Sequence, residues 1–497
     1  QTGVQGKRGA RQSGQLPFVF ADSPPGGGET GPEDGSEGRD FLLRIAKARD
    51  AKDSVAPARD GCSLLERVAS PSNLAEALLH VARNRGVPGA DEQSVEEVVE
   101  ASPRLLHRLQ RDLLSGSYRP GEILRVWIPK PGSRDRRALG IPNVVDRWVQ
   151  EALRRELERI FEPGFHTSSH GFRPGRGPRT ALAEVSEYVS AGYDWIVSLD
   201  LSKFFDRVNH QRLLARLARQ VEDGRVLQLI HQILRASVVM PTGERIAPDQ
   251  GTPQGGPLSP LLSNVVLDEL DWELDRRALR FVRYADDLQV FVRSKRSAGR
   301  VFEGLTRFVE GRLRLKVNRE KSLVTRPEGA HILGFCLHVK EAGEVEIHLS
   351  KKAKANMDAM IRALTPRTWG QSLAACIEQV NEYLQGWLGY FQLCTIEGAR
   401  LFGRFDAHIR RRVRAIVIRQ KKRDRSLYRH LRSRGVSSGA AAKAAFSHRG
   451  PWARSNHFGL TKAYSNAWFA ERLVSLRDQW QQRVARTTAS GQLSMFC

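Results

Sequence analysis

The spacing of apolar and polar residues changes along the chain, and the strand-like spacing surrounds a group of carboxylates. Residues 281–292 hold two short runs rich in Val, Phe and Tyr, which predicts two strands of a hairpin with Asp286 and Asp287 at its tip. An earlier apolar run begins at Trp195 and delivers Asp200 at its end. For the Asp-Asp turn alone, an ordinary solvated turn is the better interpretation. Three carboxylates at the ends of neighbouring strands, however, would form an all-oxygen site suited to two Mg²⁺ ions.

Helical spacing dominates elsewhere in the chain. It predicts one helix at 73–83, two more that end by about 114, and one at 144–161. Further helices are predicted after residue 179 and up to residue 274, and two lie between the Asp200 strand and about residue 238. Further strands are predicted in a hairpin at 124–142, in a strand ending at about 324, and at 331–336. From 350 onward the chain is predicted to be helical and basic. Together these elements predict an α+β fold.

The net charge of the chain limits the kinds of partner that it is expected to bind. A net charge of +24 and a pI near 10.4 favour a polyanion, and nucleic acid is the usual one. An anionic membrane surface competes, but no run of about 18 apolar residues occurs and the start lacks the hydrophobic core of a signal peptide. The scattered, odd-numbered cysteines favour a reducing cytosol and argue against a zinc module. Residues 1–60, with Gly runs and mixed charge, are predicted to be a mostly disordered extension.

The predicted hairpin at 124–142 carries Lys130, Arg136 and Arg137. By itself it is as readily a basic solvated hairpin as a binding element. Beside a metal site, the sharper interpretation is a lid that grips a triphosphate.

Two segments rich in Gly and Pro could approach a ligand closely. The loop at 169–179 offers glycines for close backbone approach, and Arg173, Arg176 and Arg179 for phosphate contacts. The segment around Gln254 is either a simple turn before a helix or a device that places this side chain against a base or sugar.

A charge run extends from Arg404 to Arg434, with thirteen Lys or Arg residues against Asp406 and Asp424. Such a run is usually a solvated face, but this one is interleaved with apolar residues and therefore belongs to a packed helix. Most of its charge then points one way, which favours a nucleic-acid-binding face. The candidate contacts are Arg410, Arg411, Arg412 and Arg414.

The order and spacing of the motifs along the chain are more informative than any single motif. In succession stand the basic hairpin, SHGFRPGR (169–176), DLSKFFD (200–206), GTPQGGPLSP (251–260), YADD (284–287), a lysine and ILGF (332–335). This order and spacing resembles the reverse transcriptases of bacterial group II introns, from roughly residue 64 to the C-terminus. GWLGYF (386–391) is similar to the start of the maturase signature, and RGPW (449–452) with AYSNAW (463–468) resembles the C-terminal segment of the compact class C proteins. Past Cys394 only Cys497 remains, so the cysteine form of the family's nuclease domain is not expected.

The resemblance implies a right-hand polymerase with an antiparallel-sheet palm and a basic helical thumb. It implies RNA-directed DNA synthesis together with intron splicing and mobility. The expected segments are a disordered extension (1–60), an RNA-binding extension with fingers (61–190), the palm with part of the fingers (191–345), the thumb or maturase X domain (346–420) and a basic DNA-binding segment (421–497).

The resemblance also assigns roles to individual residues. Asp200 and Asp286 would bridge two Mg²⁺ ions with help from the Leu201 carbonyl, Asp287 would complete the site, and Lys321 would donate a proton to the leaving pyrophosphate. The expected nucleotide-binding residues are Lys130, Arg137, Phe205, Pro253 and Gln254. The expected primer grip comprises Leu333, Gly334 and Phe335.

Three alternatives compete with this interpretation. A viral-type RNA-dependent RNA polymerase would carry an acidic residue five positions after the first catalytic Asp, whereas Phe205 stands there and would block a ribose 2′-hydroxyl. A non-catalytic maturase is expected to lose acidic residues, yet all three Asp are present. A domesticated relative serving CRISPR adaptation, phage defence or DNA repair stays open, because residues 1–60 are uninformative.

The expected partners are group II intron RNA, a DNA target and primer, and deoxynucleotides. No membrane partner is expected. The bacterial cytoplasm is the expected location, and the oligomeric state stays open.

Overall fold

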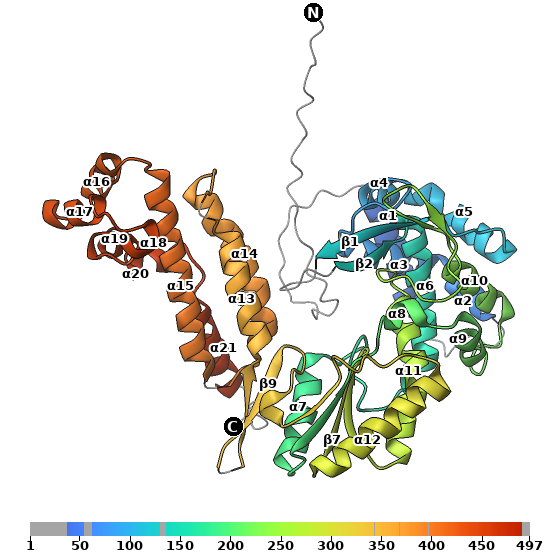
Figure 1. Ribbon diagram of the computed structural model, residues 1–497. Coiled ribbons are helices and arrows are strands. Elements are labelled where there is room, and N and C mark those ends of the chain that lie inside the picture. Colours follow the sequence, from blue (N-terminus) through green and yellow to red (C-terminus); the bar gives the residue numbers. More distant parts are fainter. Residues whose placement is uncertain are drawn as a thin grey trace, which may run out of the picture. The chain divides into compact units, whose positions relative to one another are not determined.

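The computed structural model describes residues 37–53, 62–129, 136–341, 343–366, 368–395 and 397–489 (Figure 1). Lys130, expected to grip a triphosphate, lies outside these residues. Among the described helices, none is both long and apolar enough to cross a membrane.

The N-terminal region is helical, as the spacing predicted. Its helices are α1 (Glu37–Asp53), α2 (Leu64–Val68), α3 (Pro71–Arg83), α4 (Val95–Glu100), α5 (Ser102–Ser115) and α6 (Val144–Phe161). Ser63 and Ser94 begin α2 and α4 with capping boxes, in which the hydroxyl accepts from the N–H three residues on and the Glu there accepts in return. The fully buried Trp148 donates its indole N–H to the Leu74 carbonyl at 2.6 Å, which ties α6 to α3.

Helix α1 lies within residues 1–60, the segment that was predicted to be a mostly disordered extension. Residues 37–53 of that segment form a helix that packs against α3, α4 and α5. Leu42 is fully buried, and the Ser102 hydroxyl donates to the Gly38 carbonyl at 3.2 Å. The order of this segment therefore comes from tertiary contacts rather than from its own weak amphipathic pattern.

A small mixed sheet follows the helices, in the order β2-β1-β4-β5. The predicted basic hairpin is confirmed as β1 (Ile123–Pro129) and β2 (Arg136–Ile141), which pair antiparallel. Two short strands, β4 (Val238–Val239) and β5 (Arg245–Ile246), extend the sheet on the β1 side.

The central sheet has the order β6-β7-β3-β8, and its pairs are antiparallel. Its strands are β3 (Trp195–Leu199), β6 (Arg280–Tyr284), β7 (Asp287–Val292) and β8 (Leu323–Thr325). The helices of this part of the chain are α7 (Pro178–Ser190), α8 (Phe204–Arg207), α9 (His210–Leu217), α10 (Gly224–Leu234), α11 (Ser259–Arg276) and α12 (Lys295–Phe308). This arrangement matches the palm that the resemblance implies.

Alternate residues of the central strands enter different cores. Val197 packs with the cluster that joins the N-terminal helices to α11 and α12, whereas the adjacent Ile196 packs with α7 and the C-terminal helices. In Figure 1, α7 lies on one side of β7 and α12 on the other. Burial on both faces explains why these strands are nearly continuously apolar.

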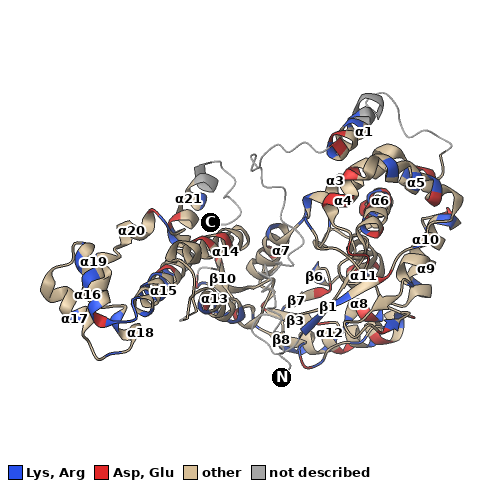
Figure 2. Ribbon diagram, turned by 90° about the horizontal axis from the view of Figure 1, so that it is seen from above, with Lys and Arg blue, Asp and Glu red and all other residues tan. Residues whose placement is uncertain are grey.

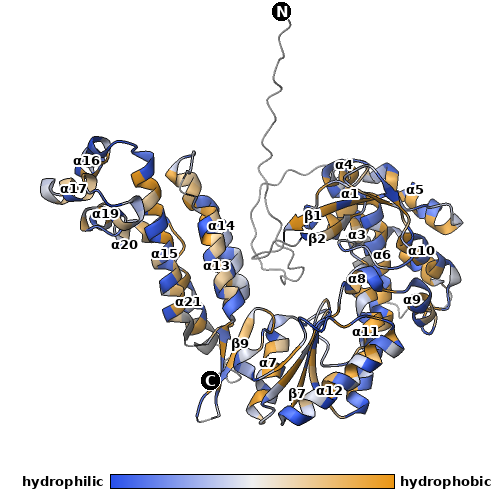
Figure 3. Ribbon diagram, in the orientation of Figure 1, coloured by the Kyte–Doolittle hydropathy of each residue, from blue (hydrophilic) through white to orange (hydrophobic). Residues whose placement is uncertain are grey.

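The C-terminal region starts with a two-stranded antiparallel sheet of β9 (Phe335–Val339) and β10 (Val345–Leu349). The helices that follow are α13 (Lys351–Leu364), α14 (Leu373–Phe391), α15 (Glu397–Gln420), α16 (Asp424–Ser433), α17 (Ser438–Ala445), α18 (Pro451–Arg454), α19 (Phe458–Ala463), α20 (Asn466–Ala470) and α21 (Leu476–Ala489). The predicted basic run is divided between α15 and α16, along which Lys and Arg are frequent (Figure 2). Apolar and hydrophilic segments alternate along α15, as expected of a packed helix (Figure 3).

Candidate active site

The three predicted carboxylates meet at one end of the central sheet. Asp286 occupies the turn between β6 and β7, and Asp287 is the first residue of β7, paired with Tyr284. Strand β3 runs antiparallel to β7 with Leu199 opposite Leu288, so Asp200 emerges beside the hairpin turn. The structure therefore brings together side chains that are more than 80 residues apart in sequence.

Burial and mutual repulsion dominate the electrostatics of this end of the sheet. Desolvation raises the pKa of Asp286, the charge of Asp200 raises it further, and Arg137 and Arg283 oppose the shift. Desolvation and the charge of Asp286 raise the pKa of Asp287 to about 7. The carboxylates thus lie close enough to destabilise one another's charged forms, which a cation would relieve.

The donor set fits Mg²⁺ as an open site. Among the described residues, no three His, Cys, Asp or Glu side chains converge into a ready-made metal cage. Mg²⁺ commonly takes one or two carboxylates and completes its shell with water and substrate phosphate oxygens. Asp200, Asp286 and Asp287 are the residues that would hold it, and the Leu201 carbonyl stays a predicted additional ligand.

A buried arginine stabilises the turn between β6 and β7. Arg283, 1% exposed, donates from Nε to Asp271 Oδ1 at 2.7 Å and from Nη1 to the Ala285 carbonyl at 2.9 Å. Its Nη2 donates to Ser169 Oγ at 2.7 Å, and its Nη1 also donates to Asn264 Oδ1 at 2.9 Å. A single guanidinium therefore joins α11, the loop at 169–176 and the turn that carries Asp286.

The loop at 169–176 packs directly against this turn. The His170 N–H donates to the Arg283 carbonyl at 2.8 Å, and the Arg283 N–H donates to the Ser168 carbonyl at 2.9 Å. A Cβ at Gly171 would lie 2.3 Å from the Ala285 nitrogen, so only glycine fits there. Ala285 itself has φ 57°, in the left-handed region, and these contacts on both sides stabilise that conformation.

The predicted nucleotide-binding residues converge through backbone contacts. The Thr252 N–H donates to the Phe205 carbonyl at 2.7 Å, which places α8 against the loop containing Pro253 and Gln254. The Gly140 N–H of β2 donates to the Gln254 carbonyl at 2.8 Å. Gly255 has φ 130°, and a Cβ there would lie 2.5 Å from the Gly140 carbonyl oxygen.

Arg137 belongs to the same region. It lies on β2, exposed, and its charge lowers the pKa of Asp286, so its guanidinium is within electrostatic range of the carboxylates. The structure thereby links the fingers hairpin to the end of the palm sheet.

The loop that precedes β8 holds the backbone of the Asp200 segment in place. The Asp200 N–H donates to Ser322 Oγ at 3.0 Å, and the Asn318 N–H donates to the Asp200 carbonyl at 2.8 Å. Lys321 is exposed in the turn next to Ser322. Its proton-donor role stays a prediction, but its position beside the Asp200 backbone is compatible with that role.

The predicted primer grip is joined to the C-terminal helices. Leu333 and Gly334 both have positive φ, 52° and 89°, and form a turn before β9. Tyr390 of α14 donates its hydroxyl to the Leu333 carbonyl at 3.0 Å, and its ring stacks on Phe335. Burial, together with the charge of Asp287, raises the pKa of the Tyr390 hydroxyl. Tyr390 therefore joins α14 to the predicted primer grip, and its hydroxyl lies within electrostatic range of Asp287.

Comparisons with known proteins agree with this geometry. Residues 128–337 match the family described as reverse transcriptase (RNA-dependent DNA polymerase), and residues 354–435 match the group II intron maturase-specific domain. Protein YkfC of Escherichia coli (strain K12) is 31% identical over 346 residues, which cover 61% of this chain and 90% of that protein. The chain belongs to the group II intron reverse transcriptases.

For a second relative of this reverse transcriptase, the match covers a smaller share of the relative's length. Group II intron-encoded protein LtrA of Lactococcus lactis subsp. cremoris is 28% identical over 330 residues, 53% of this chain and 55% of that protein. The chain therefore spans about half the length of LtrA. Among solved structures, a chain of a partial Cas6-RT-Cas1–Cas2 complex aligns with a TM-score of 0.31 and 20% identity, over 50% of this chain and 43% of that one.

Two arginines that the sequence assigned to nucleic acid have internal roles in this reverse transcriptase. Arg173 is 8% exposed, pairs with Glu162 at 2.8 Å, and donates to the Ser169 carbonyl at 2.9 Å. Arg414 is 7% exposed and donates from Nη2 to the Tyr464 carbonyl at 2.8 Å. Both guanidinium groups are buried and bonded within the protein, and their predicted phosphate contacts stay predictions.

The remaining candidate contacts differ in exposure and partners. Arg176 donates to the Thr167 carbonyl, and Arg412 donates from Nε to Thr365 Oγ1 at 2.9 Å. Arg411 lies 3.9 Å from the Trp452 ring centroid. Arg410 is half-exposed on α15 and is the member of its cluster best placed to meet a phosphate.

Sequence reasoning missed three residues whose hydrogen bonds hold the backbone of the predicted site. Arg283 and Tyr390 both lie inside or beside motifs that were recognised, YADD and GWLGYF, but their partners are distant in sequence. Ser322 directly follows Lys321. In each case the available signal was a polar residue inside or directly beside a recognised motif.

Proposed function

We propose that this chain copies an RNA template into DNA by a two-Mg²⁺ mechanism at the end of the palm sheet. The observation that carries the proposal is that Asp200, Asp286 and Asp287 lie at the same end of the central sheet, with raised pKa values for the last two. The family match supports the reaction class. When bound, the ions would activate the primer 3′-hydroxyl and stabilise charge on the leaving pyrophosphate.

The residues of the chain supply position and charge. Asp200 and Asp286 offer oxygens from two different strands, and the Ser322 and Arg283 contacts fix the two backbones that carry them. Arg137 is placed to neutralise triphosphate charge next to Asp286. Preorganised charge of this kind lowers the barrier because nothing has to reorganise during the reaction.

Phe205 supports a preference for deoxynucleotides. Its backbone is held against the Pro253–Gln254 segment, and its ring is half-buried. A ring at this position would meet a ribose 2′-hydroxyl but leave room for a deoxyribose. The proposed substrates are therefore deoxynucleotides on a primed RNA template.

Primer extension with an Asp200→Asn variant tests this proposal. We expect synthesis on an RNA template to fall below about one hundredth of wild type, because the loss of a preorganised electrostatic contact costs about 10²–10³-fold. Asp206→Asn is the matched control: the residue is exposed, six positions away, and loses the same charge. Equal rates for wild type and Asp200→Asn, or synthesis that persists after Mg²⁺ is chelated, would contradict the proposal.

A second function, intron maturase activity, is favoured by the match of residues 354–435 to the maturase-specific domain. We infer that group II intron RNA is both the template and the splicing partner, and that a DNA target and primer serve mobility. The action on these nucleic acids would take place in the bacterial cytoplasm and at the nucleoid.

A further inference from the structure

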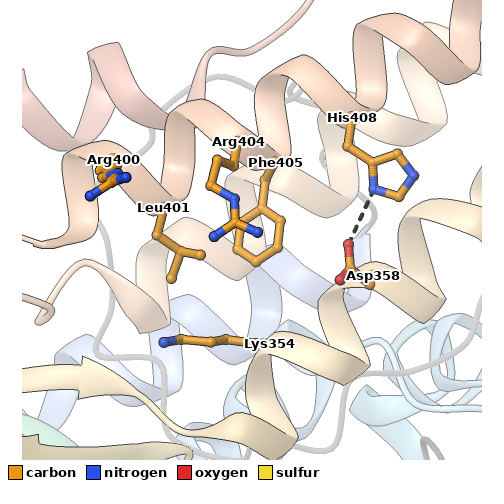
Figure 4. A pocket seen from close by; sticks show the side chains of 7 residues that line it. All are labelled: Lys354, Asp358, Arg400, Leu401, Arg404, Phe405 and His408. Atoms are coloured by element: carbon orange, nitrogen blue, oxygen red, sulfur yellow. Dashed lines mark hydrogen bonds and ion pairs between the residues drawn. The ribbon is translucent and has the colours of Figure 1, made fainter.

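A basic cavity lies between α13 and α15, outside the palm site. It has a volume of about 550 Å³ and is lined by Lys354, Asp358, Arg400, Leu401, Arg404, Phe405 and His408. In Figure 4, Arg404, Phe405 and His408 project from α15 toward α13, and Lys354 and Asp358 come from the facing helix. The cavity lies within the segment that matches the maturase-specific domain.

Among the described residues, the three cations of this cavity form no ion pair, and its one carboxylate, Asp358, is paired with His408. In the part of the chain that the structure describes, Lys354, Arg400 and Arg404 form no side-chain hydrogen bond or ion pair. Arg400 and Arg404 lie four residues apart on one helix, where like charges repel. Three unpaired cations around one hollow indicate an anionic ligand.

The remaining lining residues suit a planar, partly apolar group. Phe405 is 4% exposed and, with the half-buried Leu401, forms an apolar floor. At one end, Asp358 Oδ1 and His408 Nδ1 are 3.1 Å apart, with the Asp358 side chain 42% exposed. One carboxylate oxygen is thus fixed by His408, and the other faces the cavity region as an acceptor.

We propose that this cavity binds one unpaired nucleotide of an RNA strand. The base lies over the apolar floor beside the Arg404 guanidinium, and the flanking phosphates lie against Arg400 and Lys354. Unpaired bases are the part of RNA that proteins can stack and hydrogen-bond on their edges. The inference rests on the proposed RNA partner, and it adds a local recognition site to it.

Asp358 gives this site a base preference. A carboxylate accepts from the exocyclic amino group of cytosine, adenine or guanine, whereas uracil lacks that group and offers only its N3–H between two carbonyl oxygens, which repel a carboxylate. We therefore expect an unpaired cytidine to bind better than an unpaired uridine.

The test uses RNA duplexes that differ only in one bulged nucleotide. Binding of the full chain is measured by fluorescence anisotropy for a fully paired duplex, a single-cytidine bulge and a single-uridine bulge. We expect wild type to prefer the cytidine bulge over the paired duplex about tenfold, as for loss of one stacked base. Arg400→Ala/Arg404→Ala should remove this preference, and Asp358→Asn should remove the preference for cytidine over uridine.

Two controls separate this inference from other effects. Arg307→Ala removes one exposed charge on α12 and should keep the full bulge preference, which excludes a simple charge effect. Arg404→Lys keeps the charge but loses the planar group, so it should weaken bulge binding more than paired-duplex binding. Equal binding of bulged and paired RNA by wild type, or an unchanged cytidine preference in Asp358→Asn, would overturn the proposal.

Primer extension by the same wild-type preparation distinguishes this result from a failure of the proposed function. An active polymerase without bulge preference would reject the cavity alone. An inactive polymerase with bulge preference would reject the proposed palm chemistry and leave the cavity supported.

Discussion

The palm carboxylates and the cations of the C-terminal helices differ in how firmly the structure positions them. Asp200 and Asp286 sit on strand ends whose backbones are hydrogen-bonded to Ser322 and Arg283. Arg400 and Arg404, in contrast, are exposed on one helix, and no described carboxylate forms an ion pair with them. The carboxylates are fixed before a ligand arrives, as catalysis requires, whereas long exposed side chains can adapt to a nucleic acid.

The largest expected effect concerns the buried support of the palm. Arg283→Met leaves the fully buried Asp271 without its cation, so we expect a loss of about 3–5 kcal/mol in the free energy of unfolding. Chemical denaturation measures this. The double variant Arg283→Met/Asp271→Leu should recover most of the stability, yet extend primers more slowly, because the Ala285 carbonyl and Ser169 lose their donor.

If Arg283→Met is as stable as wild type, the palm does not depend on a fixed internal charge, and the contrast with the exposed cations of the C-terminal helices fails. Full primer-extension activity in the stable double variant would show that the network supports the fold only, and not the position of the hairpin turn.

A smaller effect is expected at the sugar gate. Phe205→Val should admit ribonucleotides about 10- to 100-fold better, because a steric barrier to one hydroxyl has about that size. Incorporation of deoxynucleotides by the same variant is the internal control and should change little. Unchanged discrimination in single-nucleotide extension would show that Phe205 is not the gate.

The smallest expected effect is a change in the salt dependence of binding, and it distinguishes two arginines of α15. Arg410→Ala should make duplex binding less salt-dependent, by about 0.9 log units per log salt for each phosphate that it neutralises. Arg414→Ala should leave that slope unchanged and lower the thermal stability instead, because its guanidinium donates to the Tyr464 carbonyl and lies 5.3 Å from the Phe469 ring centroid. The reverse outcome would mean that burial does not separate structural from binding arginines here.

The site could be predicted from sequence where its residues lie at the ends of regular strands. Short, nearly continuous apolar runs located β3, β6 and β7, and the carboxylates at their ends followed directly. The roles of Arg173 and Arg414 could not be predicted this way, because a basic run does not show which guanidinium is covered by a distant segment. Arg414, for example, is covered by Tyr464, 50 residues away.

The same limit applied to helix α1 and to Tyr390. The order of 37–53 depends on packing against helices that come later in the chain, such as α5 through Gly38 and Ser102. The Tyr390 hydroxyl reaches the Leu333 carbonyl, 57 residues earlier. Local patterns carry no signal for contacts of this kind, whereas family motifs at least mark the neighbourhood in which they occur.

We propose that the palm carboxylates perform synthesis while other surfaces bind RNA. The most direct measurement combines primer extension with RNA binding for Asp286→Ala/Asp287→Ala. The change removes two mutually repelling carboxylates and no apolar packing, so the fold should persist and can gain stability. We predict no detectable Mg²⁺-dependent DNA synthesis and unchanged affinity for intron RNA. DNA synthesis by this variant, or loss of RNA binding in a variant that stays folded, would contradict the account.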